Sequence, residues 1–170
     1  KFLEGDGLLR MGKHVERRES SLALYVGCRG AVATNSCTTA LDVVLSALEI
    51  SKGDEVIVPS QTFIATGSSV VKAGAKPTSH QVNKNFLIDI VDLKKKITSK
   101  TKAVILVHFA GLILEDILVL RRFLNKRNII LIEDAAHACG ASINNLKAGN
   151  LGNVACFSFF STKNITTGEG

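Results

Sequence analysis

The chain has few cysteines, and their spacing excludes the common uses of paired cysteine. No C-x-x-C pair occurs, and no cysteine stands at zinc-site spacing from a histidine. The first residues contain no apolar segment of the kind that a secretory signal needs. We therefore expect reduced core thiols, no metal site and a cytoplasmic protein. The four cysteines are Cys28, Cys37, Cys139 and Cys156.

Long apolar runs are also absent. No stretch reaches the roughly 18 apolar residues that span a bilayer, so we expect no membrane contact. With 170 residues, of which 46% are hydrophobic, the chain can bury one substantial core, and one domain is the simplest expectation. The sequence has no initiator methionine and stops in a turn-like segment at Gly170. We therefore expect residues 1–170 to be part of a longer protein.

Aromatic residues are scarce outside the apolar runs. The chain has eight phenylalanines and one tyrosine, whereas nucleic-acid binding surfaces combine a basic stripe with exposed aromatics. The net charge of +6 comes from basic groups scattered over predicted helices, where such groups usually form a solvated face. We expect no nucleic-acid binding, although a weak positive field can attract phosphate-bearing ligands.

The chain does contain a regular alternation of short apolar runs and amphipathic stretches. Strand-like and helix-like segments follow one another through short turns, which is typical of right-handed crossovers between parallel strands. The sequence therefore predicts an α/β fold with three layers, in which helices cover both faces of a mostly parallel sheet. Predicted strands are 31–33, 55–58, 76–79, 103–107, 129–132 and 154–160; predicted helices are 12–25, 38–48, 63–73, 90–97 and 113–124.

The turn over residues 34–39 is the first candidate binding segment. It is rich in hydroxyl side chains and opens an amphipathic helix, so its N–H groups and the hydroxyls of Ser36, Thr38 and Thr39 can hold a phosphate. Ordinary helix capping by Ser or Thr explains the same pattern. Neither G-x-G-x-x-G nor G-x-x-x-x-G-K-[ST] is present, so the sequence lacks the dinucleotide and P-loop fingerprints.

Two ionisable residues follow apolar strands later in the chain. Asp134 ends the run at 129–132, and Lys163 follows the run at 154–160 in a turn rich in Ser, Thr and Gly. In an open α/β sheet, ligands bind outside the carboxyl ends of the strands. Lysine forms Schiff bases, and a carboxylate suits a pyridinium nitrogen, so this pair predicts pyridoxal phosphate as cofactor. Taken singly, a solvated lysine and a helix-capping aspartate remain the simpler interpretations.

Phe63 follows the predicted strand at 55–58. An aromatic ring at this edge of a sheet can lie flat on a planar cofactor. The alternative is that Phe63 begins the next helix as a core residue.

Taken together in chain order, these segments resemble the sugar aminotransferases of the DegT–DnrJ group. Members of that group are pyridoxal-phosphate enzymes that act on nucleotide-linked keto sugars. The two most specific matches are Glu-Asp-Ala-Ala-His at 133–137 and the lysine segment at 157–170. The matching segments are 25–27, 36–41, 53–60, 62–66, 107–111, 133–141 and 157–170.

The resemblance implies a role for each matching residue. Lys163 would carry the Schiff base and move the proton between substrate and cofactor. Asp134 would pair with the protonated pyridine nitrogen, and His137 would hydrogen-bond the ring hydroxyl. The remaining cofactor positions are Phe63 at the ring face and Cys37, Thr38 and Ser158 near the phosphate.

The resemblance also implies partners and a larger protein. We expect a nucleotide-linked keto sugar, an amino-acid amine donor such as glutamate, and a homodimer with shared active sites. The chain would be the partial large domain of a fold-type I aminotransferase, without the C-terminal domain. It departs from the group at residues 112–114, where Leu-Ile-Leu replaces a polar residue and a proline, and at His80, where Asp is common.

Two alternatives stay open. A related pyridoxal-dependent sugar dehydratase would have the same fold, but these enzymes replace the Schiff-base lysine with histidine, and Lys163 is present. A truncated relative without catalytic activity would act as a regulatory or interaction protein.

Overall fold

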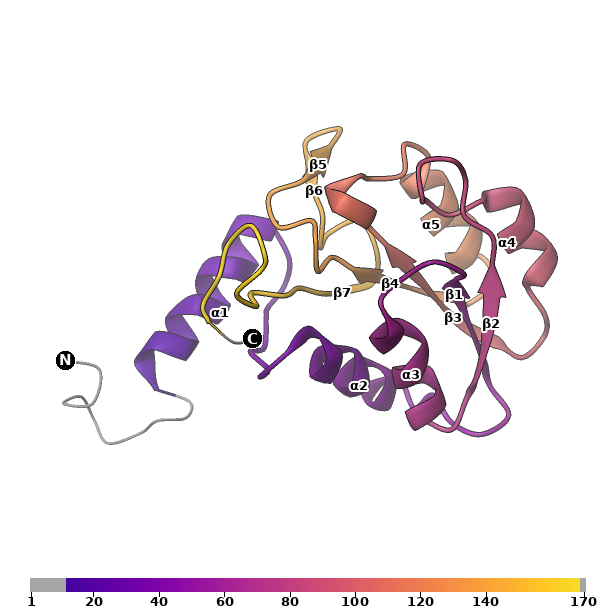
Figure 1. Cartoon of the computed structure of the whole chain (residues 1–170), viewed down its shortest axis with the longest axis horizontal. Helices are drawn as coiled ribbons and strands as arrows, with labels where there is room; N and C mark the ends of the chain where they lie inside the picture. Colours follow the sequence, from indigo (N-terminus) through magenta and orange to yellow (C-terminus); the bar gives the residue numbers. More distant parts are fainter. Residues whose placement is uncertain (1–11, 169–170) are drawn as a thin grey trace.

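The computed structural model describes residues 12–168, and its centre is a five-stranded parallel sheet with the strand order β2-β1-β3-β4-β7. Helices α2 and α3 lie together on one face of this sheet (Figure 1), and α4 and α5 pack against the other. The predicted three-layer α/β fold is therefore confirmed. The sheet contains β1 (Glu55–Pro59), β2 (Lys76–His80), β3 (Thr101–Val107), β4 (Ile130–Asp134) and β7 (Val154–Cys156).

The described residues form five α-helices, of which the first two precede β1 and the other three connect successive strands. They are α1 (Lys13–Val26), α2 (Cys37–Ala47), α3 (Ile64–Lys72), α4 (Ile90–Lys96) and α5 (Ile117–Asn125). A 3-10 turn, η1 (Phe109–Gly111), follows β3, and a small hairpin of β5 (Ser142–Ile143) and β6 (Leu146–Lys147) separates β4 from β7. None of the helices within residues 12–168 is long and apolar enough to cross a membrane.

The core is divided by the sheet into two parts. Successive side chains of a strand point to opposite faces, so Val56 and Val58 of β1 pack on the α2/α3 side while Ile57 packs on the α4/α5 side. All five residues of β1 are buried, as expected for a central strand of a parallel sheet covered on both faces. The same alternation sends Ile132 of β4 to the α2/α3 side and Leu131 to the other.

The outer strand β2 has the features of a sheet edge. Its first four residues are exposed or half-buried, and Pro77 lies in it beside Val56 of β1. Proline cannot donate to a ladder, so it is tolerated at an edge and rarely in a central strand.

The structure corrects three of the sequence-based elements. Residues 31–33 form no strand: they lie in the link between α1 and α2, Val32 is 81% exposed, and the Ala33 N–H donates to the Glu19 carboxylate (2.7 Å) instead of to a neighbouring strand. The run at 154–160 is a strand only to Cys156, because β4 has ended by then and offers no ladder partner. The helix predicted from 113 begins at Ile117, after the η1 turn and an extended Leu112.

Candidate active site

The carboxyl edge of the sheet opens between β1 and β3. The chain leaves β1 toward α3 on one face, and it leaves β3 toward α5 on the other face. Neighbouring parallel strands whose connections diverge in this way leave a crevice where ligands bind in open α/β sheets. The loops after β1, β3, β4 and β7 all reach this edge. Together with the end of β4 they carry five of the seven predicted site residues, and the other two are at the start of α2.

Asp134 is the last residue of β4, and its carboxylate is buried on the α2/α3 side. Its Oδ2 accepts a hydrogen bond from the Thr66 hydroxyl (3.0 Å), and its Oδ1 accepts one from the Ala136 N–H (3.2 Å). Asp134 is 6% exposed. An ionised carboxylate offers about four acceptor sites, so two partners leave room for a further donor.

Lys163 lies in a closed loop after β7. The loop is tied at its base by the Thr167 N–H and the Thr166 hydroxyl, which both donate to the carbonyl oxygen of Phe159 (2.9 and 3.2 Å). Near its tip the Lys163 N–H donates to the Phe160 carbonyl (2.9 Å). The backbone on both sides of the lysine is therefore held, while its side chain stays half-buried.

The side chains of Lys163 and His137 line the same hollow, which has a volume of about 370 Å³. Ala110 of the η1 turn completes it, together with Thr162 and Asn164 beside the lysine. Burial lowers the pKa of His137 from its ordinary value, the charge of Lys163 lowers it further, and Asp134 opposes the change. The imidazole is thus neutral near neutral pH, with one nitrogen as donor and the other as acceptor.

The start of α2 reaches the same edge of the sheet. Ser36 caps the helix, because its hydroxyl accepts from the Thr39 N–H (3.1 Å) and also contacts the Thr39 hydroxyl (3.0 Å). These two hydroxyls therefore serve the helix cap, which was the alternative interpretation. The N–H groups of Cys37 and Thr38, at the first two helical positions, have no acceptor within the helix and form a natural anion site with the helix dipole.

Cys37 and Cys156 are close to the site but are not reactive thiols. Burial raises the pKa of both, to about 12 for Cys156, and the negative charge of Asp134 adds to the rise. The charge of Lys163 opposes the rise for Cys37, which places that thiol near the lysine as well. Thiols held protonated pack as small apolar groups. All four cysteines are free.

Phe63 is not a core residue. Its side chain is 72% exposed at the N-cap of α3, so the alternative core interpretation is wrong. An exposed aromatic ring beside a crevice is free to contact a planar ligand. Ser158, by contrast, is buried after β7, and its hydroxyl accepts from the Phe160 N–H (3.4 Å).

Two residues of this region were missed by the sequence analysis. Thr66 reaches Asp134 across 68 positions of the chain, so only the tertiary structure brings them together. Ala110 lines the hollow with a left-handed backbone (φ 51°), which is uncommon for a residue other than glycine and is often found at functional sites.

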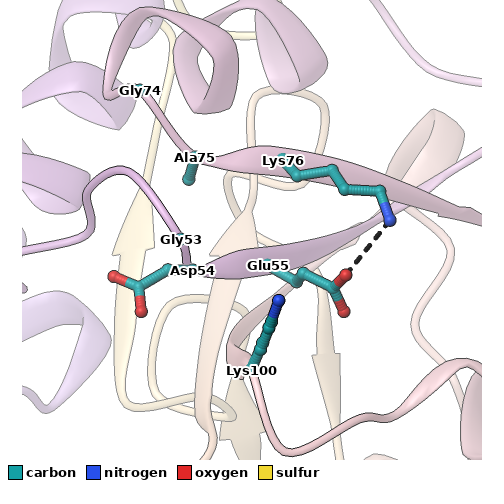
Figure 2. A pocket seen from close by; sticks show the side chains of 7 residues that line it. All are labelled: Gly53, Asp54, Glu55, Gly74, Ala75, Lys76 and Lys100. Carbon is teal, nitrogen blue, oxygen red and sulfur yellow. Dashed lines mark hydrogen bonds and ion pairs between the residues drawn. The ribbon is translucent and has the colours of Figure 1, made fainter.

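A second hollow, of about 260 Å³, lies at the opposite, amino-terminal edge of the sheet. Figure 2 shows the Lys76 side chain extending toward Glu55, with which it forms an ion pair (3.1 Å), while Lys100 lies just before β3. The Thr98 hydroxyl occupies the other oxygen of Glu55 (2.7 Å). Both oxygens of Glu55 thus already have partners. The hollow lies at the amino ends of the strands, which is unusual for a ligand site in this architecture.

Within residues 12–168, no group of three or more His, Cys, Asp and Glu side chains could hold a metal ion. The groups that the carboxyl edge offers for chemistry are a buried carboxylate, a lysine, a histidine with a lowered pKa and the N-terminus of α2.

The comparisons with known proteins identify the family of the chain. The DegT/DnrJ/EryC1/StrS aminotransferase family matches the chain over residues 1–170, and the chain belongs to this family. GDP-perosamine synthase from Vibrio cholerae is 41% identical over 160 residues, which cover 94% of the chain and 43% of the relative. The spore coat polysaccharide biosynthesis protein SpsC from Bacillus subtilis is 40% identical, with 96% and 42% covered.

Solved structures share the fold. Spr1654 from Streptococcus pneumoniae, assigned as a sugar aminotransferase and solved in its PLP form, superposes with a TM-score of 0.89 at 33% identity, covering 94% of the chain and 44% of that protein. DesV from S. venezuelae, solved in complex with a ketimine intermediate, has a TM-score of 0.87 at 36% identity, with 92% and 42% covered. The chain thus spans less than half the length of the relatives it matches.

Proposed function

We propose that the protein containing this chain is a pyridoxal-phosphate-dependent aminotransferase that transfers an amino group to a keto carbon of a nucleotide-linked sugar. The observation that carries the proposal is the joint location of Lys163 and Asp134. They follow the neighbouring strands β7 and β4 at the same edge of the sheet, and His137 shares the hollow of Lys163. Family membership and the PLP form of Spr1654 support the choice of cofactor.

The residues present fit this cofactor. Pyridoxal phosphate supplies an electron sink that stabilises the negative charge left when a proton is removed from the amine-bearing carbon. Asp134 has acceptor capacity left for a protonated ring nitrogen, and a neutral His137 can hydrogen-bond the ring oxygen. The N–H groups of Cys37 and Thr38 suit the phosphate, with Ser158 close to the same edge, and exposed Phe63 suits the ring face.

Lys163 has two tasks in this proposal. Its amine would hold the cofactor at its carbonyl carbon in the resting enzyme, with loss of the carbonyl oxygen as water. Once the substrate amine had displaced it, the freed lysine amine would hold and move the proton at the reacting carbon. The tied base of its loop fixes the backbone, so the amine returns to the same position in each half-reaction.

The substrate class rests on the relatives. GDP-perosamine synthase and the polysaccharide protein SpsC both point to sugar biosynthesis. We propose a nucleotide-linked keto sugar as acceptor, an amino acid such as glutamate as donor, and a homodimer with shared active sites. The presence of Lys163 disfavours the dehydratase, and the intact set of Lys163, Asp134 and His137 disfavours a regulatory relative without catalysis.

Borohydride labelling tests the proposal directly. The protein, as naturally produced, is loaded with pyridoxal phosphate, reduced with borohydride, digested and mapped for pyridoxylated lysines. We expect the label on Lys163, together with amino transfer to a nucleotide-linked keto sugar in a substrate screen. Lys147 is the control: its ammonium lies over the Tyr25 ring (3.5 Å from the centroid), away from the hollow.

The two arms separate the alternatives. Label on Lys147 or elsewhere, with none on Lys163, contradicts the assignment of the site. Label on Lys163 without transfer to any keto sugar keeps the cofactor site and rejects the substrate class.

A further inference from the structure

Thr66 connects two residues of the candidate site. Its side chain has no exposed surface, and its hydroxyl donates to Asp134 Oδ2 (3.0 Å). Its backbone N–H donates to the carbonyl oxygen of Phe63 (3.1 Å), which is the N-cap residue of α3. One buried residue of α3 therefore contacts both the carboxylate and the backbone of the exposed aromatic.

The hydrogen bonds around Thr66 have a fixed direction. An ionised carboxylate is only an acceptor, so the single hydroxyl proton of Thr66 points to Asp134. The Thr62 hydroxyl lies 2.8 Å from the Thr66 hydroxyl and must then be the donor of that bond. Thr62 therefore donates to Thr66, and Thr66 donates to Asp134, so both hydrogen bonds point toward the carboxylate. Successive hydrogen bonds of this kind polarise one another.

We propose that Thr66, oriented by Thr62, is a positioning residue of the active site: it holds the Asp134 carboxylate in the orientation that receives the cofactor ring and holds the segment that presents Phe63. The proposal rests on the proposed function. Thr66 does not touch the reacting atoms and acts through Asp134.

The geometry makes the hydroxyl more than a packing group. The Ala136 N–H restrains one carboxylate oxygen of Asp134, and Thr66 restrains the other. With Thr66 removed, one oxygen of a buried carboxylate loses its donor, and the side chain can rotate about its last bond. A hydrogen bond to a charged group is among the stronger ones in proteins, and its loss at a buried site is correspondingly costly.

The helix offers a closely matched control. Ser69 is also on α3 and also buried, but its hydroxyl has no hydrogen-bond partner within the described part of the chain. Thr66→Val removes the hydroxyl and keeps the branched shape, whereas Thr66→Ser keeps the hydroxyl. Thr62→Val removes the donor to Thr66 and leaves the hydrogen bond from Thr66 to Asp134 possible. Ser69→Ala removes a buried hydroxyl that contacts neither Asp134 nor Phe63.

The experiment uses the protein as naturally produced and has two readouts. The first is the dissociation constant of pyridoxal phosphate, and the second is the separation of kcat from KM for amino transfer. For Thr66→Val we expect cofactor binding about tenfold weaker and kcat lower by about ten- to a hundredfold, with KM for the sugar changed by less than about threefold. Thr66→Ser should recover most of both, Thr62→Val should fall between, and Ser69→Ala should match the wild type.

The outcomes distinguish the two claims. A wild-type protein that binds no pyridoxal phosphate rejects the proposed function. A wild type that binds and transaminates, with Thr66→Val unchanged in both readouts, rejects the positioning role alone. Equal losses in Thr66→Val and Thr66→Ser also reject it, since the hydroxyl is then not the cause. If Thr66→Val fails to fold, Thr62→Val decides: an unchanged kcat and cofactor affinity reject the role, and a loss of either supports it.

Discussion

Two acidic residues stand side by side at the end of β4, and the strand gives them different environments. Glu133 points to the α4/α5 side and is completely buried, where its two oxygens accept from the N–H groups of Gly149, Leu151 and Gly152 and from His108. Asp134 points to the opposite side and has two donors among the described residues. Glu133 is thus saturated and structural, whereas Asp134 keeps acceptor capacity for a ligand.

Asp134→Asn should separate catalysis from folding. The amide is nearly the same size, so the sheet should form, but it carries no negative charge to pair with a protonated ring nitrogen. We expect turnover to fall by roughly a hundredfold or more, which corresponds to about 2.7 kcal/mol, while circular dichroism and much of the cofactor binding persist.

Glu55→Gln is the control for the loss of a carboxylate. Glu55 is at the amino-terminal edge of the same sheet and is paired with Lys76 and Thr98. The turnover of the Glu55→Gln variant should equal that of the wild type. Normal transamination by the Asn variant would show that Asp134 has another role.

At the scale of elements, the turn at 149–152 is attached to β4 by Glu133. The three N–H donors of this turn lie just before β7, whose end leads to Ser158 and Lys163. The turn also fits closely: a Cβ at Gly152 would lie 2.7 Å from the Leu131 carbonyl oxygen and 3.0 Å from Glu133 Cγ. The position of the lysine loop therefore depends on a small residue at Gly152.

Gly152→Ala should lower the stability of the protein and displace β7. The new methyl group meets backbone that cannot move without breaking the Glu133 hydrogen bonds, so we expect a loss of about 1–3 kcal/mol in the free energy of unfolding, measured by urea denaturation. Binding of pyridoxal phosphate should weaken in parallel.

Gly67→Ala is the same chemical change, but it should raise the free energy of unfolding instead of lowering it. Gly67 lies inside α3, and a Cβ there meets no atom within 4 Å. Alanine favours the helix, so the variant should be more stable by about 0.5–1 kcal/mol. Equal effects of the two substitutions would contradict the close fit at Gly152.

The elements also show what a sequence can and cannot predict. Asp134 and Lys163 each come at or after the end of an apolar run, and this predicted that both lie at the same edge of the sheet. The prediction works because the carboxyl ends of parallel strands lie at one edge. The run at 31–33 had the same apolar character but no neighbouring strand to pair with, so it formed none. Thr66 could not be found, since a hydroxyl in a helix gives no sign of a carboxylate 68 positions away.

At the scale of the whole molecule, several large apolar side chains lie on the surface. Among the described residues, Leu24 and Val32 are 85% and 81% exposed, and Phe63 and Ile64 are 72% and 74% exposed. Figure 1 shows that α1 lies at one end of the molecule. The chain spans 43% of GDP-perosamine synthase. Large exposed apolar side chains of this kind often mark a surface that contacts another polypeptide segment or a partner.

The 170-residue chain produced by itself should therefore not transaminate, although it holds most of the proposed cofactor contacts. Strand β7 pairs only with β4 among the described residues, so it forms an outer edge of the sheet. Such an edge favours association or partial unfolding. We expect size-exclusion chromatography with light scattering to show heterogeneous species and an amino-transfer assay to show no turnover, whereas the protein as naturally produced should be uniform and active. A monodisperse 170-residue chain with full activity would contradict this expectation and would mean that the chemistry needs neither the remaining sequence nor a shared site.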